Sequence, residues 1–479
     1  MASTYFERLV AGRTDNTTRQ TRHRIVLFTM CLGVFIAQLD STVVYLGVKH
    51  IGDDLGSSVS ELQWVLDVYN LVYASLLLTG GTLGDLYGRT RIFVCGIALV
   101  AVGSIVCALA PNSATLIAGR AVTGIGAALE LPSSLAILTV TYKDAHERGR
   151  AIGIWASCNG LAIAIGPTLG GLLVDTAGWR SIFYVVIPVC ALGMAMALRS
   201  VPESSNPQGR HLDPAGQILA IIALAALSFV VIEGPHWGWT SPVILALAAV
   251  TVVATALFIA VEARTPGAMV PLDIFASRPL NAALAVAGLM TFGMYALLFL
   301  TPLYLQSVRG LSGLVAGLLL VPMSLTFVVV SQYSGTLMKR IGARAMMASG
   351  MGLMGGGLLL LTPISPTTSL LAIVLALVII GVGLGMNTGP VNAVAVANVP
   401  AARSGTASGL INTTRMIGAT LGIAVLGAIF AVHAGAGTTD GMITGLRWAF
   451  LGGAIGELAG AVIALAFTRA DSMDHAKKA

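Results

Sequence analysis

Apolar residues run along this chain in long stretches that short polar segments interrupt. A helix needs about 20 mainly apolar residues to cross a bilayer, and stretches such as 353–361 and 370–384 lack the alternation of ~10-residue barrel strands. The pattern therefore predicts an all-α integral membrane protein with fourteen transmembrane helices. Their expected ranges are 25–48, 62–81, 92–110, 115–140, 150–173, 182–199, 216–233, 242–262, 281–304, 314–334, 346–363, 369–390, 408–431 and 445–468.

The amino-acid composition agrees with a lipid environment and argues against several classes of protein. Only 10% of the 479 residues are charged, against roughly 25% in soluble domains. The five cysteines form no C-x-x-C pair and the histidines lie in tails, loops or predicted helix ends, so neither a disulfide framework nor a metal site is expected. The sequence also lacks a G-x-x-x-x-G-K-[ST] phosphate loop and the common hydrolase motifs. We expect neither an enzyme nor a nucleic-acid-binding protein, because topology explains the net charge of +6.

Basic residues predict how the chain is oriented in the membrane. Short cytoplasmic loops of membrane proteins are enriched in Lys and Arg. With the N-terminus inside, most of the 27 basic residues fall on the cytoplasmic side, and Lys49, Arg180 and Arg309 are among the exceptions. Residues 1–24 are expected to form a cytoplasmic tail rather than a cleaved signal peptide. An even number of spans returns the C-terminus inside, so residues 469–479 form a second cytoplasmic tail.

Two polar loops in corresponding places indicate an internal repeat. Residues 81–90 and 335–344 align without gaps and share Gly, Thr, Leu and Gly. Parallel repeats of this kind are related by an axis along the membrane normal. The expected segments are a first six-helix bundle at 25–199, linkers with two inserted helices (216–233 and 242–262) at 200–280, and a second six-helix bundle at 281–468.

Four acidic residues fall inside predicted spans, where a charge costs about 2.5–3.5 kcal/mol on insertion scales. They are Asp40, Asp67, Glu130 and Glu457. Burial disfavours the charged form of a carboxyl group, so coupling to a proton or cation is one interpretation of Asp40. The other is a structural carboxylate held by neighbouring donors, and we favour the first. Asp67 lies nearer the outer surface, where a solvated structural acid and a proton or substrate role are equally supported.

Small and polar residues recur at steps of three and four along one face of the predicted helix 115–140. They are Arg120, Thr123, Gly124, Ala127, Glu130 and Ser134. Arg120 and Glu130 lie about 15 Å apart along the helix axis, which is too far for a direct ion pair. We therefore expect Arg120 to pair across helices with Asp40 or Asp67. For Glu130, an interhelical hydrogen bond and a functional role are both open.

The second half of the chain has its own intramembrane polar residues, namely Asn387, Asn392, Asn412, Arg415 and Glu457. For Arg415 and Glu457 we favour a structural ion pair. In the predicted helix 150–173, glycines surround Pro167, which removes side-chain bulk and one backbone hydrogen bond. Such a segment suits a moving helix interface, but a static close crossing requires the same residues.

Five segments match motifs of one transporter family. Residues 81–91 are similar to G-x-L-a-D-r-x-G-R-k, residues 116–126 to l-x-x-x-R-x-x-q-G-x-g and residues 166–171 to G-P-x-x-G-G. Residues 40–44 are similar to D-x-T-v-v and residues 64–69 to W-v-v-d-a-Y. Over nearly its whole length the chain thus resembles the major facilitator superfamily, specifically its fourteen-span drug:proton antiporter branch. The resemblance implies export of amphiphilic, often cationic drugs in exchange for protons, by rocking of two six-helix bundles around a central cavity.

The resemblance also implies roles for single residues. Carried over by motif, Asp40 would be the leading protonation site and Arg120 its modulator; Glu130, which departs from the family pattern, is added as a further proton-coupling candidate. The candidate substrate-binding residues are Asp67, Glu130, Tyr45, Trp64, Asn387 and Asn412. The candidate gating residues are Gly81, Asp85, Gly88, Arg89, Arg91, Gly166, Pro167 and Gly170.

The chain departs from the family pattern at three places. Residues 45–49 replace the usual n-v-A-L-P, Thr123 replaces a glutamine, and Glu130 occupies a commonly apolar position. These departures bear on the substrate range more than on the fold.

The expected function is proton-driven multidrug export across a bacterial cytoplasmic membrane. We expect the protein to act as a monomer and to need no cofactor or metal. Its partners would be a small amphiphilic or cationic substrate, protons and the lipid bilayer. One alternative is a dedicated exporter of a single metabolite, antibiotic or lipid. The other is a non-transporting membrane sensor, which the absence of long soluble segments disfavours.

Overall fold

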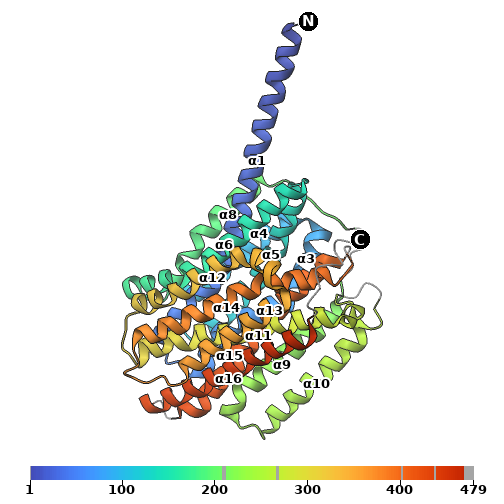
Figure 1. Ribbon diagram of the computed structural model, residues 1–479. Helices are drawn as coiled ribbons and strands as arrows, with labels where there is room; N and C mark the ends of the chain where they lie inside the picture. The colour runs from blue at the N-terminus through green and yellow to red at the C-terminus, as the bar shows by residue number, and fades with distance from the viewer. Residues whose placement is uncertain (1, 208–211, 266–268, 401–402, 436–437, 469–479) are drawn as a thin grey trace.

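Long helices packed side by side make up the whole body of the protein (Figure 1). The computed structural model describes residues 2–207, 212–265, 269–400, 403–435 and 438–468. Within these ranges every regular element is a helix, and fourteen helices are long and apolar enough to cross a membrane. The predicted all-α membrane fold with fourteen transmembrane helices is therefore confirmed.

The first bundle is built around α5, which packs against α3 and α4, while α1 packs against α6 and α8. Its six long helices are α1 (Ala2–Val43), α3 (Val59–Tyr87), α4 (Arg89–Ala108), α5 (Ser113–Thr141), α6 (Ala145–Ala177) and α8 (Val186–Ser200). Its short elements are η1 (Val44–Leu46), α2 (Val48–Leu55) and α7 (Ser181–Tyr184). Side-chain caps begin several of these helices: Ser58 forms a capping box with Glu61 at α3, and Asn112 accepts from the Thr115 N–H at α5.

In the second bundle, α11 packs against α15 and α16, and α14 packs against α12 and α13. Its helices are α11 (Arg278–Ser307), α12 (Gly313–Ile341), α13 (Ala343–Leu361), α14 (Leu370–Ala397), α15 (Ser404–Ala434) and α16 (Thr439–Phe467), preceded by the short η2 (Leu272–Ala276). The two bundles meet where α3 packs on α15 and where α6 packs on α12.

The two inserted helices, α9 (Pro214–Trp237) and α10 (Pro242–Glu262), lie at one edge of the protein (Figure 1). Asp213 caps α9 by accepting from the Gly216 N–H, and Pro214 occupies the first turn, where its missing N–H is tolerated. α9 packs against α10, α15 and α3, so it borders the junction of the two bundles.

The first span differs from its expected range of 25–48 at both ends. α1 begins at Ala2, inside the predicted tail, and its first part extends away from the rest of the protein (Figure 1). At the other end α1 stops at Val43, and η1 and α2 follow around Gly47. Glycine and β-branched residues lower helix propensity, which explains the break. The predicted tail 469–479 lies outside the described residues.

At one end, which we call the closed end, the two bundles are packed tightly. A methyl group at Gly317 of α12 would lie 2.5 Å from the Pro167 carbonyl oxygen of α6, and Gly171 of α6 lies against the Gly313 backbone in the same way. Three polar side chains also join the bundles there. Gln63 donates to the Ile423 carbonyl oxygen (3.1 Å), Gln306 donates to the Leu46 carbonyl oxygen (3.2 Å), and Asp175 accepts from the Gly313 N–H (2.9 Å).

Toward the opposite end, which we call the open end, the bundle interface is partly accessible to solvent. On α15, residues 418–428 are almost entirely buried, whereas residues 412–417 are partly or fully exposed. On α6, Gly166, Pro167 and Gly170 are buried, whereas a methyl group at Gly153 would meet no atom within 4 Å. The interface is therefore closed over half of its depth only.

Candidate functional site

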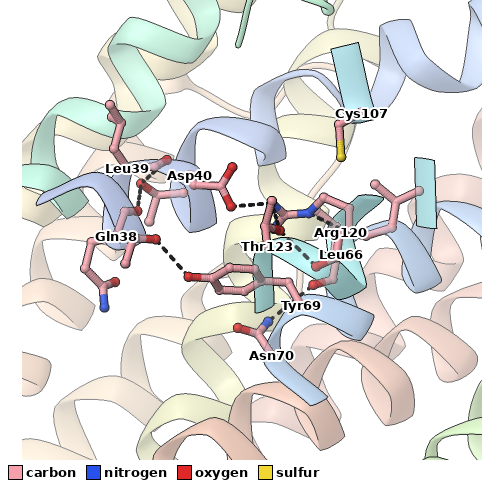
Figure 2. A network of polar contacts seen from close by, with 12 residues as sticks. Gln38, Leu39, Asp40, Leu66, Tyr69, Asn70, Cys107, Arg120 and Thr123 are labelled. Atoms are coloured by element: carbon pink, nitrogen blue, oxygen red, sulfur yellow. Dashed lines mark hydrogen bonds and ion pairs between the residues drawn. The ribbon is translucent and has the colours of Figure 1, made fainter. Parts of the chain in front are cut away.

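A buried ion pair joins α1 to α5 near the closed end (Figure 2). Arg120 donates from Nη1 to Oδ2 of Asp40 at 2.6 Å, and both side chains are at most 1% exposed. The expected pairing of Arg120 across helices is present, and its acid is Asp40 rather than Asp67. The other carboxylate oxygen of Asp40, Oδ1, has no hydrogen-bond partner among the residues that the structure describes.

The surroundings of Arg120 compensate most of its charge. Its Nε donates to the Val65 carbonyl oxygen at 3.2 Å, and Nη1 also approaches the Thr123 hydroxyl at 3.4 Å. The guanidinium lies over the ring of Tyr69, 4.6 Å from the centroid, where the aromatic face attracts a cation. Tyr69 is fixed in turn because its hydroxyl donates to the Ala37 carbonyl oxygen at 2.9 Å (Figure 2). The pair is therefore held rigidly inside the first bundle.

Asp67 occupies a second buried polar site, between the two bundles and the inserted helix α9. Its side chain on α3 is fully buried, beside Ser228 of α9 and Thr420 of α15. Within the described residues neither carboxylate oxygen forms a well-aligned hydrogen bond, although both hydroxyls lie beside the carboxyl group. The site is thus not the solvated outer position that was one of the two interpretations of Asp67.

Two further buried acids, Glu130 and Glu457, also have carboxylate oxygens that find no hydrogen-bond partner in the described part of the chain. Glu130 of α5 lies against Gly33 of α1, and Glu457 of α16 lies against Gly293 of α11. An ionised carboxyl group in either place would have no donor to offset its desolvation. Each acid faces the interior of its own bundle.

The expected ion pair between Arg415 and Glu457 is wrong for the described chain, since no such pair forms. Glu457 is directed at the α11 backbone by its contact with Gly293, and the Nε and Nη2 atoms of Arg415 are buried without a partner. The sequence places both residues inside spans but does not fix the rotation of α15 and α16 about their axes.

The remaining candidate substrate-binding residues are spread over different surroundings. Tyr45 is buried in η1 and makes an edge contact with Tyr295 of α11, with centroids 6.3 Å apart, so it lies where the bundles meet. Trp64 donates to Glu233 of the inserted helix α9 at 2.9 Å. Asn387 is buried and donates to the Gly383 carbonyl oxygen at 3.1 Å, beside α13. Asn412 is exposed. The structure does not bring these four residues together, and their substrate roles stay predictions.

The candidate gating residues fall into two groups. At the open end, Arg89 and Asp85 form an ion pair of 2.7 Å one turn apart, Gly81 lies near Pro132, and Arg91 is largely exposed. The second group is Gly166, Pro167 and Gly170, buried on α6.

Close contacts of this second group explain why its residues are small. A methyl group at Gly170 would lie 2.5 Å from the Val43 carbonyl oxygen of α1, and Gly166 lies against Thr42 of the same helix. Pro167 instead faces Gly317 of α12. The motif therefore sits between the helix that carries Asp40 and the second bundle.

Glu203, which the sequence did not single out, completes the loop at the open end. Its carboxylate accepts from the Thr90 and Arg91 N–H groups at 3.0 and 3.1 Å, and so caps the N-terminus of α4. Gly88 has φ +110°, a conformation that favours glycine, and a methyl group there would lie 2.7 Å from the Glu203 carboxyl carbon. The hydrogen-bond partners of Glu203 are backbone N–H groups and its ion pair with the largely exposed Arg91 is long, at 3.7 Å, so side-chain patterns carry little signal for it.

An exposed ion pair marks the surface of the closed end. Arg180 donates to Asp54 of α2 at 2.6 Å, and the Trp179 indole N–H donates to the same oxygen at 3.0 Å. The hydrogen bond from Arg180, followed by that from Trp179, holds the pKa of Asp54 below its ordinary value. Arg180 was predicted outside the cytoplasmic loops, and it lies at this end of the protein.

Comparison with known proteins agrees with this architecture. Residues 30–423 match the Major Facilitator Superfamily. The chain is 40% identical to the multidrug resistance protein Stp of Mycobacterium tuberculosis over 85% of this chain and 76% of that protein. It is 35% identical to the methylenomycin A resistance protein of Bacillus subtilis, over 86% and 89% of the two chains. It is 32% identical to the multidrug efflux pump LfrA of Mycolicibacterium smegmatis, over 88% and 83%.

Solved structures show the same fold. The crystal structure of a POT family transporter in complex with 5-aminolevulinic acid superposes with a TM-score of 0.70, covering 92% of this chain and 96% of that one at 15% identity. A peptide transporter POT in complex with sulfate gives a TM-score of 0.68 at 17% identity, covering 92% and 94%. Fold, sequence match and relatives agree, and the chain belongs to the Major Facilitator Superfamily as a multi-pass bacterial membrane transport protein.

Proposed function

We propose that this protein is a secondary transporter that exports small amphiphilic drugs or antibiotics in exchange for protons. Relatives over most of its length are named as multidrug resistance proteins and efflux pumps, which supports drugs as substrates. We further propose that it works as a monomer without a cofactor, with both termini in the cytoplasm. The distribution of basic residues supports this orientation, in which the open end faces the cytoplasm.

The buried Asp40–Arg120 ion pair is the main observation that supports proton coupling. Asp40 gives one carboxylate oxygen to Arg120 and keeps the other without a partner, in a site at most 1% exposed. A proton on Asp40 would remove the negative charge opposite a permanently charged arginine. The pair would then rearrange, and whichever bundle arrangement accommodates the protonated form better would gain population.

Alternating access is supported by the unequal packing of the bundle interface. Glycines of α6 and α12 allow backbone contact at the closed end, while the interface toward the open end is partly accessible. In the proposed cycle these contacts separate when the open end closes. The bundles are joined at the closed end by a few hydrogen bonds of ordinary length and by close-packed small residues. Two rigid bundles can break and re-form such contacts as they move as units.

Drug-dependent proton release from energised inside-out vesicles tests the proposal, using a panel of cationic, neutral and anionic drugs. Vesicles with the wild-type protein should release protons when a transported drug is added. Asp40→Asn should abolish this release, whereas Asp53→Asn should not, because Asp53 is a largely exposed acid paired with Lys49 on the surface. No coupled flux in the wild type, or full flux in the Asp40→Asn variant, would overturn the proposal.

A dedicated exporter is the second candidate, because some relatives carry the name of one antibiotic. Besides the methylenomycin A resistance protein, the tetracenomycin C resistance and export protein of Streptomyces glaucescens is 32% identical over 85% of this chain. Growth protection of an efflux-deficient host separates the two candidates. A dedicated exporter should protect against one chemical class, and a multidrug exporter against several.

A further inference from the structure

Arg415 is the second arginine of the membrane-spanning interior, and it differs from Arg120 because no residue that the structure describes pairs with its charge. It lies on α15, the helix of the second bundle that packs on α3 of the first. Its neighbour Met416 packs against an apolar cluster of the first bundle that includes Tyr69 and Tyr73. Arg415 therefore belongs to the stretch of α15 that faces the bundle interface.

The unpartnered atoms of Arg415 form one edge of its guanidinium. Nε and Nη2 are buried and donate to nothing within the described residues. In a planar guanidinium the N–H bonds of these two nitrogens run parallel, a fork that matches the two oxygens of a carboxylate. Arg120, in contrast, uses its donors on Asp40 and on the Val65 carbonyl oxygen.

No acidic side chain of the described chain compensates Arg415. The titratable groups that interact with it are the phenols of Tyr295 on α11 and Tyr73 on α3, one from each bundle. Glu457, the expected partner, is directed at Gly293 instead. Arginine keeps its charge at all physiological pH values, and a charge inside the membrane without a counter-ion is costly. An anionic group from outside the chain would therefore complete the site.

Arg415 is partly accessible as a whole, and buried tyrosines of both bundles lie in its neighbourhood. It lies in the accessible stretch 412–417 of α15, toward the open end. Tyr295 stands edge-on to Tyr45, and Tyr73 lies 6.2 Å from Tyr69, centroid to centroid. Aromatic rings next to a free guanidinium fork suit a molecule with an apolar ring system and an acidic group.

We infer that Arg415 anchors the transported molecule through its carboxylate, so that the substrates include aromatic or alicyclic monocarboxylates. The inference rests on the proposed export function and names a substrate class for it. It differs from the often cationic substrates that the family resemblance implies for the protein. The carboxylate would accept from Nε and Nη2 side by side, while the ring system lies among the tyrosines of both bundles.

Three pyrene probes test the inference on the purified full-length protein in detergent: 4-(1-pyrenyl)butyrate, its methyl ester, and the trimethylammonium analogue with the same pyrenylbutyl group. Calorimetry should show the carboxylate binding wild-type protein at least about tenfold more tightly than the ester, as expected for a bidentate charged contact, and more tightly than the cation. Arg415→Gln should bind carboxylate and ester equally. Arg415→Lys should keep part of the preference, since it retains the charge and loses the fork.

Arg447→Gln is the matched control, because Arg447 of α16 already donates to the Ile364 carbonyl oxygen at 3.0 Å. It should leave the carboxylate preference unchanged. Equal binding of all three probes to wild-type protein, or a preference that survives in Arg415→Gln, would overturn the inference. If Arg415→Gln does not fold, the order in which wild-type protein binds the carboxylate, the ester and the cation still tests whether the site prefers a carboxylate. Proteoliposome flux of the butyrate probe is measured separately, so that a failure of export is distinguished from a failure of carboxylate recognition.

Discussion

Replacing Asp175 by alanine should loosen the closed end without unfolding either bundle. Asp175 belongs to α6 of the first bundle, yet its carboxylate accepts from two N–H groups of α12 in the second. The distances are 2.9 Å from the Gly313 N–H to Oδ1 and 2.7 Å from the Leu314 N–H to Oδ2. These N–H groups belong to the first turn of α12 and have no acceptor within their own helix. Asp175 therefore caps a helix across the bundle interface.

The size of the effect follows from the geometry. A carboxylate on free N–H groups combines a capping hydrogen bond, typically about 1 kcal/mol, with the attraction of a helix N-terminus for negative charge, about 0.3–1 kcal/mol. Asp175 is exposed, so water screens the charge and we take about 1 kcal/mol in all. Such a loss shifts the ratio of closed to separated ends by about fivefold, because about 1.4 kcal/mol corresponds to tenfold.

Double electron–electron resonance between the bundles measures this shift. Ala114, at the start of α5, and Thr367, between α13 and α14, are exposed and belong to different bundles, so a label on each reports their separation. Labels attached through a non-canonical amino acid avoid the five native cysteines. Asp175→Ala should raise the ratio of the longer-distance to the shorter-distance population by about fivefold over the same label pair in otherwise wild-type protein.

Ser312→Ala provides a control on the same helix end. Ser312 caps α12 from within the second bundle, accepting from the Val315 N–H at 3.3 Å. Its loss weakens the helix start but leaves the contact between bundles in place. The reasoning is refuted by an unchanged distance distribution in Asp175→Ala, or by an equal shift in Ser312→Ala.

Two further predictions concern the same end of the protein. Gly171→Ala should destabilise the closed arrangement by about 1–3 kcal/mol, because it forces a methyl group onto the α12 backbone. The same distance measurement should then show a larger separated population. Gly153→Ala is the control and should leave that population unchanged, because a methyl group at Gly153 meets no atom within 4 Å. The stability contributed by the surface pair Asp54–Arg180 should depend on pH. Arg180, with Trp179, lowers the pKa of Asp54 in the folded protein. The stabilisation is therefore fully present above the unfolded pKa of about 4, and it is lost as pH falls through the lower folded pKa. Trp179 fluorescence should therefore be constant from pH 8 to 5 and change only below about pH 4, and Asp54→Asn should remove that change; a transition near neutral pH would contradict this assignment.

The sequence was sufficient for the architecture because hydrocarbon imposes strong constraints on it. The predicted range 242–262 coincides with α10, and the predicted 216–233 lies within α9, since Pro214 and the Asp213 cap fix its true start. Boundaries failed where polar residues continue a helix beyond the span, as in α1. The length and hydropathy of an apolar stretch indicate which part of a helix lies in lipid. They do not indicate at which residue the helix ends.

Predictions about the site depended on what kind of partner a residue has. The high cost of an unpaired charge in lipid indicated that Arg120 would find an acid, and it did. The same reasoning failed for Arg415 and Glu457, because helix rotation turns them apart. Asp175 and Glu203 went unnoticed, because their hydrogen-bond partners are backbone N–H groups that every helix start offers.

The placement of strong and weak polar contacts is itself consistent with bundles that move as units. The Asp40–Arg120 pair, whose disruption would cost about 3–5 kcal/mol when one partner is removed, lies inside the first bundle. Gln63, Gln306 and Asp175, which join the bundles, each use backbone atoms of the other bundle. Such hydrogen bonds contribute about 0.5–1.5 kcal/mol each, and water can replace them once the ends separate. A rearrangement that breaks only these contacts leaves each bundle rigid, whereas an ion pair across the interface would resist separation.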